Sequence, residues 1–272
     1  MVSAREKLHS ITKTLASGAG VFDPAFEARE IIREYAGDAA LIGGGLDDPQ
    51  TKLIDAAVSR RLNGEPLQYI FGKWEFYGFP FYVGEGVLIP RPETELLVDI
   101  AAERLGKNSL LIDLCSGTGC IPISAALKTG AKCYAVELYD AAFSYLTRNI
   151  ALNRADVTAI QADATDGTLF PGLEFDAVIS NPPYLTGTEM KSLMREVAHE
   201  PETALYGGED GLGFYRALIP AWSARLSENG FMAVETGETQ GPAVAEIMRE
   251  SGLEPRIIKD YAGLDRVVTG EK

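Results

Sequence analysis

The sequence has few cysteines and histidines, the side chains that most often bind zinc. Only three cysteines and two histidines occur among its 272 residues. No two of the cysteines, Cys115, Cys120 and Cys133, have the two-residue spacing of a zinc ligand pair, and only His9 and His199 are present to assist them. We therefore expect no metal site and interpret the cysteines as small buried hydrophobic side chains.

Long apolar segments are also missing. No run of about 18 apolar residues occurs, which is the length that a membrane-spanning helix requires, and the N-terminus has no apolar signal core. We expect a protein of the cytoplasm with no membrane partner. A composition of 46% apolar residues over 272 positions suffices for a sizeable core, in one large domain or in two ordinary ones.

Basic residues are the third group in short supply. The sequence has 25 lysines and arginines but 39 aspartates and glutamates, which gives a formal net charge of -14. A protein that binds DNA or RNA mainly through phosphate contacts needs a basic face, so the composition argues against a nucleic-acid partner, although a local basic patch stays open. The charge fits a basic macromolecular partner better, but many acidic proteins use their charge only for solubility.

The most informative stretch is Asn181-Pro182-Pro183-Tyr184. Its two prolines have no N–H, and the first of them pushes Asn181 toward an extended conformation. The Asn181 side chain and the Pro182 carbonyl can then form an array of acceptors that fits a planar amino group. The apolar residues 175–180 before it predict a buried parallel strand, at whose end ligands bind in open α/β sheets. A lone Pro-Pro more often only ends a strand, so this interpretation needs support from elsewhere.

Support comes from other predicted strand ends. The apolar run 110–114 leads through the glycine-containing turn 115–119 into a helical pattern, which is typical of a nucleotide-type cofactor loop. The next strand, 132–137, ends in Glu137 about two dozen residues after Asp113, where a carboxylate can accept from both ribose hydroxyls of an adenosine. A strand over 157–160 has a polar end at Asp163 that can meet the adenine. The predicted cofactor-binding residues are Asp113, Cys115, Ser116, Gly117, Thr118, Gly119, Glu137, Asp163, Ala164 and Asn181.

Together these strand ends resemble those of the S-adenosylmethionine-dependent methyltransferases that modify planar amino groups. The resemblance so far covers residues 110–184.

Residues 1–72 predict a separate helical bundle. Ser3 with Glu6 forms a capping box, Asp23-Pro24 places an N-cap before a first-turn proline, and Asp48-Pro49 starts a third helix. The expected apolar positions are Leu8, Ile11, Leu15, Phe26, Ile31, Tyr35, Leu53, Ile54 and Val58. Packing is the simplest role for this bundle, but its separate amphipathic pattern suggests a domain that presents a face to a partner.

The rest of the chain predicts a doubly wound sheet. Aromatic residues on both sides of Gly78 predict a β-hairpin within residues 73–90 that joins the two domains. The loop 90–95 then caps a helix. Strands and helices alternate from there, with a helix over 213–226, a strand over 231–235 and a closing antiparallel pair at 256–259 and 266–268. We expect an α/β domain over 91–272 with about seven strands.

The whole chain resembles the release-factor glutamine methyltransferases, also called HemK-type proteins. The residues that carry the resemblance are Trp74 and Phe76 in the hairpin, the loop from Pro90 to Glu95, the segment from Asp113 to Gly119, the segment from Asn181 to Tyr184, Glu200-Pro201, Ala204-Leu205 and Asp265-Arg266. Two departures stand out: Cys115 replaces a usual glycine, and Glu137 replaces a frequent aspartate.

This resemblance implies a Rossmann-like methyltransferase sheet that uses S-adenosyl-L-methionine and releases S-adenosyl-L-homocysteine. It implies methylation of the glutamine amide in the Gly-Gly-Gln motif of class-one peptide chain release factors, the proteins of translation termination. We expect Asn181, Pro182, Pro183 and Tyr184 to be the catalytic and substrate-binding residues, with the Tyr184 ring beside the amide or simply packed. An amide nitrogen is a poor nucleophile, so we expect catalysis by positioning without a strong general base.

Two alternatives stay open. An adenine-amino methyltransferase of DNA or RNA would use the same acceptors on a flipped base, with Tyr184 stacked on it, but would be expected to carry a basic groove. A non-catalytic binding module would keep the fold and lose the acceptor site, against which the intact Asn181, Glu137, Gly117 and Gly119 argue.

Overall fold

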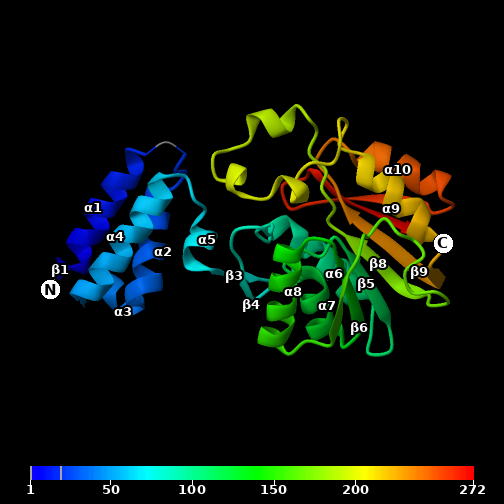
Figure 1. Cartoon of the computed structure of the whole chain (residues 1–272), viewed down its shortest axis with the longest axis horizontal. Helices are drawn as coiled ribbons and strands as arrows, with labels where there is room; N and C mark the ends of the chain where they lie inside the picture. The colour runs from blue at the N-terminus through cyan, green and yellow to red at the C-terminus, as the bar shows by residue number, and fades with distance from the viewer. Residues whose placement is uncertain (1, 19) are drawn as a thin grey trace. The chain divides into compact units, whose positions relative to one another are not determined.

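The structure, a computed structural model, describes residues 2–18 and 20–272. The chain forms two compact units, one made of Met1–Gly72 and Leu193–His199 and the other of Lys73–Ser192 and Glu200–Lys272. Figure 1 labels their elements along the chain. The first unit therefore includes a short segment from the second half of the sequence.

The first unit consists mainly of helices whose starts follow the capping residues. They are α1 (Ala4–Ala16), α2 (Pro24–Ala36), α3 (Asp38–Leu41), α4 (Asp48–Leu62) and α5 (Leu67–Phe71). The Asp23 carboxylate accepts from the backbone N–H of Phe26 at 2.9 Å, as the sequence predicts for α2. Helix α4 begins at Asp48, as predicted. Asp47 caps it, because the Asp47 carboxylate and the Gln50 side chain each accept from the other residue's backbone N–H.

Two further details differ from a purely helical bundle. The two-residue strand β1 (Val2–Ser3) pairs with β2 (Gly45–Leu46), so the predicted all-helical domain contains a short antiparallel ladder. Phe26 and Leu53, which we expected on apolar stripes, are 45% and 51% exposed. The core of this unit is instead formed by other residues, including Ile11, Leu15, Ile31, Ile32, Leu46 and Ile54.

A buried arginine binds the segment Leu193–His199 to the helices of the first unit. Arg61 on α4 is only 1% exposed and donates to the Glu27 carboxylate at 2.6 and 3.0 Å. It also donates to the carboxylate of Glu196, which belongs to the segment Leu193–His199. A buried guanidinium requires such partners, because an uncompensated buried charge is strongly destabilising.

The second unit begins with the predicted hairpin. Strands β3 (Lys73–Phe76) and β4 (Phe79–Tyr82) are antiparallel. Tyr77 and Gly78 between them both have positive φ angles, 54° and 77°, as a two-residue hairpin turn of type I′ requires. Phe76 and Phe81 are buried in the same core cluster as the helix residue Leu97.

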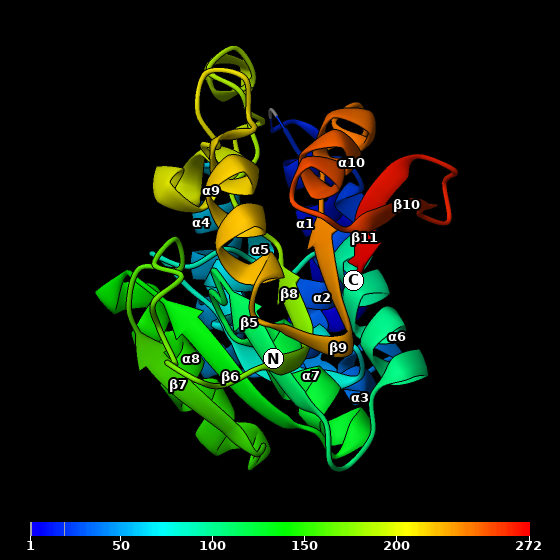
Figure 2. The same cartoon turned by 90° about the vertical axis from the view of Figure 1, so that its right-hand side faces the viewer.

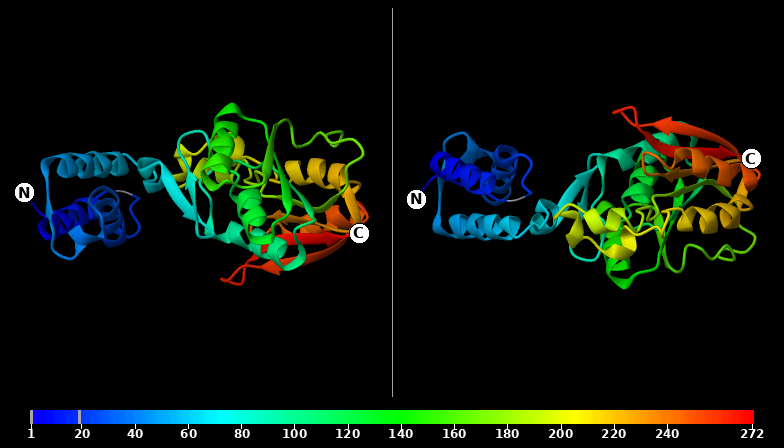
Figure 3. Two further views of the ribbon diagram at one scale, coloured as in Figure 1. Left: turned by 90° about the horizontal axis from the view of Figure 1, so that it is seen from below. Right: turned by 90° about the horizontal axis from the view of Figure 1, so that it is seen from above.

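The central sheet has seven strands, as predicted. They are β5 (Leu110–Leu114), β6 (Lys132–Glu137), β7 (Val157–Gln161), β8 (Phe175–Ser180), β9 (Leu226–Glu235), β10 (Glu254–Lys259) and β11 (Asp265–Glu271). Their order is β10-β11-β9-β8-β5-β6-β7, with β5 to β9 parallel and the β10–β11 hairpin antiparallel at one edge. The orange-red to red colour of this C-terminal hairpin locates it at one side of the second unit in both views of Figure 3. The predicted Rossmann-like methyltransferase fold is confirmed.

Helices cover both faces of this sheet (Figure 2). They are α6 (Glu95–Arg104), α7 (Cys120–Thr129), α8 (Asp140–Asn153), α9 (Gly213–Ser223) and α10 (Gly241–Glu250), of which the sequence analysis did not predict α10. Alternate residues of β8 point to opposite faces: Ala177 and Ile179 join the core with α6 and α7, while Val178 joins the core with α9 and α10. The predicted end of the helix at 226 was wrong, because Leu226 already begins β9.

Short 3-10 helices interrupt the loops, namely η1 (Pro92–Thr94), η2 (Glu189–Ser192), η3 (Val197–His199) and η4 (Glu202–Ala204). In the part of the chain that the structure describes, no helix has the length and apolar character needed to cross a membrane.

Candidate active site

The site lies at the point of the sheet where the direction of the strand order reverses. From β5 the chain continues to β6 on one side, whereas from the neighbouring β8 it continues to β9 on the other side, so the connections that follow β5 and β8 lead away from each other. This switch point is where open α/β sheets bind ligands. A cavity of the second unit is lined by residues that follow β5, β6, β7 and β8, together with residues of the loops 86–94 and 201–204.

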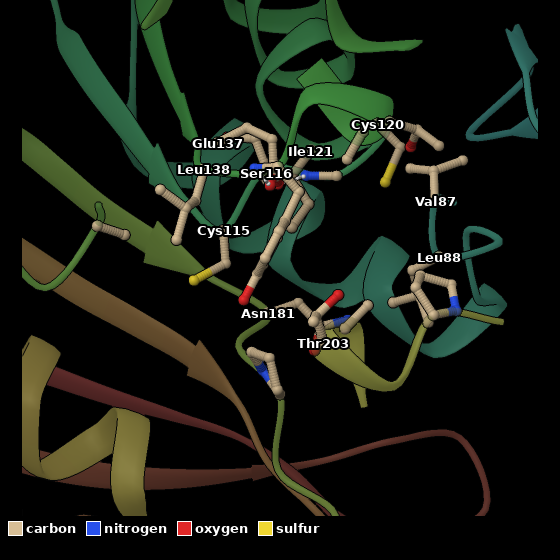
Figure 4. A pocket seen from close by; sticks show the side chains of 18 of the residues that line it. Val87, Leu88, Cys115, Ser116, Cys120, Ile121, Glu137, Leu138, Asn181 and Thr203 are labelled. Carbon is tan, nitrogen blue, oxygen red and sulfur yellow. Dashed lines mark hydrogen bonds between the residues drawn. The ribbon is translucent and has the colours of Figure 1, made fainter. Parts of the chain in front are cut away.

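The cavity brings together most of the predicted site residues (Figure 4). The lining contains Cys115, Ser116, Gly117, Thr118, Glu137, Asp163, Ala164, Asn181 and Pro183. Asp113, Gly119, Pro182 and Tyr184 are not among the lining residues. In Figure 4, Cys115, Ser116 and Glu137 lie on one side of the space and Asn181 and Thr203 on the other.

The turn after β5 has a strained, compact backbone. Cys115, Gly117 and Gly119 all have positive φ angles, 62°, 52° and 78°. A residue with a Cβ in this region costs about 1–3 kcal/mol, which gives a physical reason for the glycine usual at the position of Cys115. At Gly119 the φ angle of 78° favours glycine, and a Cβ there would also lie 2.5 Å from the end of the Leu146 side chain.

Glu137 both lines the cavity and holds this turn. One of its carboxylate oxygens accepts from the Gly117 N–H at 2.8 Å, and the other accepts from the Tyr139 N–H at 2.9 Å. The residue is 6% exposed. A carboxylate has about four acceptor positions, so these two bonds leave capacity for hydroxyl groups of a ligand.

Asp113 lies beneath the turn and does not reach the cavity. It is fully buried, and neither of its carboxyl oxygens has a hydrogen-bond partner among the described residues. The Ser116 hydroxyl, 3.0 Å away, donates to the backbone carbonyl of Asp113 and not to its side chain. Burial raises the pKa of Asp113 to about 8, because the charged form loses its hydration.

On the acceptor side, Asn181 is tied to two buried residues from other elements. Its side-chain N–H donates to the Thr94 hydroxyl at 3.2 Å, and that hydroxyl donates to the Glu235 carboxylate at 2.6 Å. Glu235 is 1% exposed at the end of β9, and burial raises the pKa of its carboxyl to about 7. The Tyr184 hydroxyl lies 3.5 Å from the other Glu235 oxygen. The Tyr184 side chain is thus engaged by Glu235, and its predicted contact with a substrate stays a prediction.

The loops around the cavity mouth are held by one carboxylate. The Glu200 side chain, 2% exposed, accepts from the backbone N–H of Ile89 at 2.9 Å and pairs with the guanidinium of Arg91. Arg91 and the neighbouring Pro201 both line the cavity. Glu200 therefore joins two stretches that are about one hundred residues apart in the sequence.

Comparison with known proteins identifies the family. Residues 6–72 match the family model described as the PrmC N-terminal domain, and residues 92–209 match the one described as the methyltransferase small domain. A release factor glutamine methyltransferase of Moorella thermoacetica is 38% identical over an alignment that covers 97% of each chain. One of Neisseria gonorrhoeae is 36% identical over 91% of this chain and 93% of its own.

The chain belongs to the release factor glutamine methyltransferase family. The predicted resemblance is confirmed, and the protein is a methyltransferase.

Solved structures agree on the fold. A methyltransferase of Pyrococcus furiosus superposes with a TM-score of 0.57 at 19% identity, over 72% of this chain and 90% of its own. A 16S rRNA methyltransferase of T. thermophilus, in complex with AdoMet and guanosine, gives a TM-score of 0.53 at 19% identity, over 74% of this chain and 49% of its own. At these identities the likeness concerns the sheet and its helices alone.

Several residues of the site were not predicted in this role. Thr94 and Arg91 lie in the loop 90–95, and Pro201 and Thr203 lie near the resemblance motif that begins at Glu200. The sequence identified these stretches as typical of the family without assigning them a function. Glu235 had a readable signal, because it is a carboxylate at the end of a predicted strand, as Glu137 is.

Proposed function

We propose that this protein transfers the methyl group of S-adenosyl-L-methionine to the side-chain amide nitrogen of the glutamine in the Gly-Gly-Gln motif of class-one release factors, and releases S-adenosyl-L-homocysteine. Family membership supports the reaction. The observation that carries its assignment to this site is that Asn181 and Pro183 share one cavity with Gly117 and Glu137.

The cofactor fits the donor set of the cavity. Glu137 has acceptor capacity left for the ribose hydroxyls, and it lies between the turn 115–119 and residues Leu138 and Tyr139. We assign the ribose to Glu137, the adenine to the side of Leu138, Asp163 and Ala164, and the methionine part to the turn that begins at Cys115. When bound, the cofactor supplies a methyl group on a sulfonium, which a nucleophile can attack.

The protein's contribution to the chemistry is positioning. The nitrogen of a carboxamide is a poor nucleophile, because its lone pair is delocalised into the carbonyl. The Asn181 side-chain oxygen and the Pro182 carbonyl accept from the two amide hydrogens of the substrate and direct its nitrogen toward the methyl group. Orienting two bound reactants lowers a barrier by about 7–11 kcal/mol. No strong base is required: as the methyl–sulfur bond breaks, its electron pair stays on sulfur, and the cationic N-methylated amide that forms is strongly acidic and loses one N–H proton to water.

The helical unit is proposed as the region that recognises the release factor. It is a compact unit with its own core, and it matches a family domain over residues 6–72. Binding energy obtained there, away from the reacting amide, helps to hold a weak nucleophile in place. Release factors act in translation termination, so we place the protein in the cytoplasm.

Methylation of adenine amino groups in DNA or RNA is the competing reaction. It would use the same acceptors on a flipped base. Relatives that align with this chain over nearly their full length are named release factor glutamine methyltransferases. In addition, the net charge of -14 opposes binding to a polyanion.

A substrate comparison with labelled cofactor tests the proposal. Transfer of the labelled methyl group is measured to intact release factor, to release factor whose Gly-Gly-Gln glutamine is replaced by alanine, to duplex DNA and to ribosomal RNA. We expect label only in the intact release factor. Label in either nucleic acid, or equal label in the release factor without the glutamine, would contradict the proposal.

A further inference from the structure

A chain of three side chains connects Asn181 to the interior of the second unit. Glu235 ends β9, Thr94 ends η1, and Asn181 follows β8, so each comes from a different element. The Thr94 hydroxyl donates to Glu235 at 2.6 Å and accepts from the Asn181 side-chain N–H at 3.2 Å. Glu235 and Thr94 are 1% and 2% exposed, so they are largely shielded from bulk solvent.

The direction of each bond in this chain follows from the groups that form it. An ionised carboxylate accepts hydrogen bonds and donates none. The single hydroxyl hydrogen of Thr94 is therefore used by Glu235, and only lone pairs of the Thr94 oxygen remain for Asn181. Asn181 must then present its NH2 group to Thr94.

A carboxamide has one donor end and one acceptor end, so fixing one end fixes the other. With the NH2 group of Asn181 bonded to Thr94, its oxygen is the end that remains for the cavity, which Asn181 lines. If the amide turned over, its oxygen would face the Thr94 lone pairs and its NH2 group would face the substrate. Two NH2 groups cannot hydrogen-bond each other productively in this geometry.

We propose that Glu235 and Thr94 are positioning residues that keep the Asn181 oxygen directed at the glutamine amide of the substrate. This inference rests on the proposed function, in which Asn181 accepts from that amide. It adds two residues that act through Asn181.

The hydrogen bonds that link Asn181, Thr94 and Glu235 make methyl transfer depend on pH. Burial raises the pKa of Glu235 to about 7, with Glu93 acting in the same direction, while Thr94, Arg266 and Tyr184 oppose the shift. The hydroxyl of Tyr215 donates to the Glu235 backbone carbonyl at 2.8 Å and does not contact the carboxyl group.

A protonated Glu235 can donate to Thr94. The Thr94 hydroxyl is then free to donate to the Asn181 oxygen. This reverses the direction of both hydrogen bonds and turns the Asn181 NH2 group toward the substrate. The turnover number of the wild-type protein should therefore fall as the pH drops below about 7.

The test uses the full-length protein and intact release factor. Thr94→Val keeps the shape of the side chain and removes the hydroxyl, so we expect kcat to fall about tenfold or more while the dissociation constant of S-adenosyl-L-methionine stays within about twofold. Thr94→Ser restores the hydroxyl and should keep kcat within about threefold of wild type. Thr236→Val is the matched control: the Thr236 hydroxyl is buried beside Glu235 and has no hydrogen-bond partner among the described residues, so kcat should not change.

A pH profile provides a second, independent readout. Because Glu235→Gln has no carboxyl group to titrate, the decline of kcat below about pH 7 should disappear in this variant and persist in Thr236→Val. Wild-type kcat in Thr94→Val, or an unchanged acid limb in Glu235→Gln, would overturn the inference. Asn181→Ala distinguishes a failure of the acceptor role of Asn181 from a failure of the positioning role of Thr94 and Glu235. If this variant retains full turnover, the proposed acceptor role fails; if it loses activity while Thr94→Val does not, only the positioning chain fails.

Discussion

Replacing Glu137 by alanine tests how one carboxylate serves both the cofactor and the turn that holds it. In the protein this carboxylate accepts from the N–H groups of Gly117 and Tyr139 at 2.8 and 2.9 Å. We propose that it also accepts from the ribose hydroxyls. The substitution removes all of these bonds at once.

The two effects have separate magnitudes. A hydrogen bond to a charged group contributes about 1.5–3 kcal/mol, so loss of the ribose contact should weaken S-adenosyl-L-methionine binding by about 10- to 150-fold. The N–H groups of Gly117 and Tyr139 lose their acceptor as well, which should lower the free energy of unfolding by about 1–3 kcal/mol. Glu137→Gln keeps one acceptor oxygen and should show a smaller loss of affinity.

Calorimetric titration with the cofactor, together with urea unfolding, measures both quantities. Asp166→Ala is the matched control, because the Asp166 carboxylate also accepts two local bonds, from the N–H and hydroxyl of Thr168, but does not line the cavity. We expect its cofactor affinity to equal that of wild type. Unchanged affinity in Glu137→Ala would refute the assignment of the ribose to this residue.

Two other predictions concern the helical unit and Asp113. A shortened chain that begins at Gly72 should still bind S-adenosyl-L-methionine, as titration would show. It should methylate intact release factor much less efficiently than the full chain does, but a short Gly-Gly-Gln peptide about as well. Equal activity of both proteins on intact release factor would contradict a recognition role for residues 1–72. For Asp113, burial raises the pKa to about 8 from an ordinary 3.8, so its contribution to stability is fully present below about pH 3.8 and is lost as the pH rises to about 8. Between pH 5 and pH 8, urea unfolding should show that the free energy of unfolding of wild type falls by more than about 1.4 kcal/mol relative to that of Asp113→Asn. If the difference in unfolding free energy between the two proteins is the same at both pH values, the prediction is contradicted.

The fold was largely predictable because its signals are local. Strands β5, β6 and β8 are short apolar runs that are followed by a Gly-containing turn, end in an acidic residue or lead into Pro-Pro, and each was predicted with the bounds that the structure has. Helix α10 was not predicted, and the helix α9 was extended into β9. Helix α10 did have local signals, a first-turn proline at Pro242 and buried Val244, Ala245 and Met248 at helical spacing, whereas the end of α9 depends on the pairing of β9 with its neighbours in the folded sheet.

The site was less predictable where it depends on long-range contacts. The residues after β5, β6 and β8 could be grouped because parallel strand ends meet at one edge. The bond from Thr94 to Glu235 joins positions 141 residues apart, and Glu200 reaches back to Arg91 across 109 residues. Composition and periodicity contain no information on such pairs. The loops that contain them were recognised only as family motifs.

The most direct test of the account is single-turnover methyl transfer by Asn181→Ala to intact release factor at saturating cofactor. Loss of an oriented polar contact to a reacting group costs at least about a hundredfold in rate, so we predict that decrease, with cofactor affinity nearly unchanged. Mass spectrometry of the wild-type product should place the methyl group on the glutamine of the Gly-Gly-Gln motif. Near wild-type transfer by Asn181→Ala, with the methyl group on the same glutamine, would contradict the claim that Asn181 holds the amide.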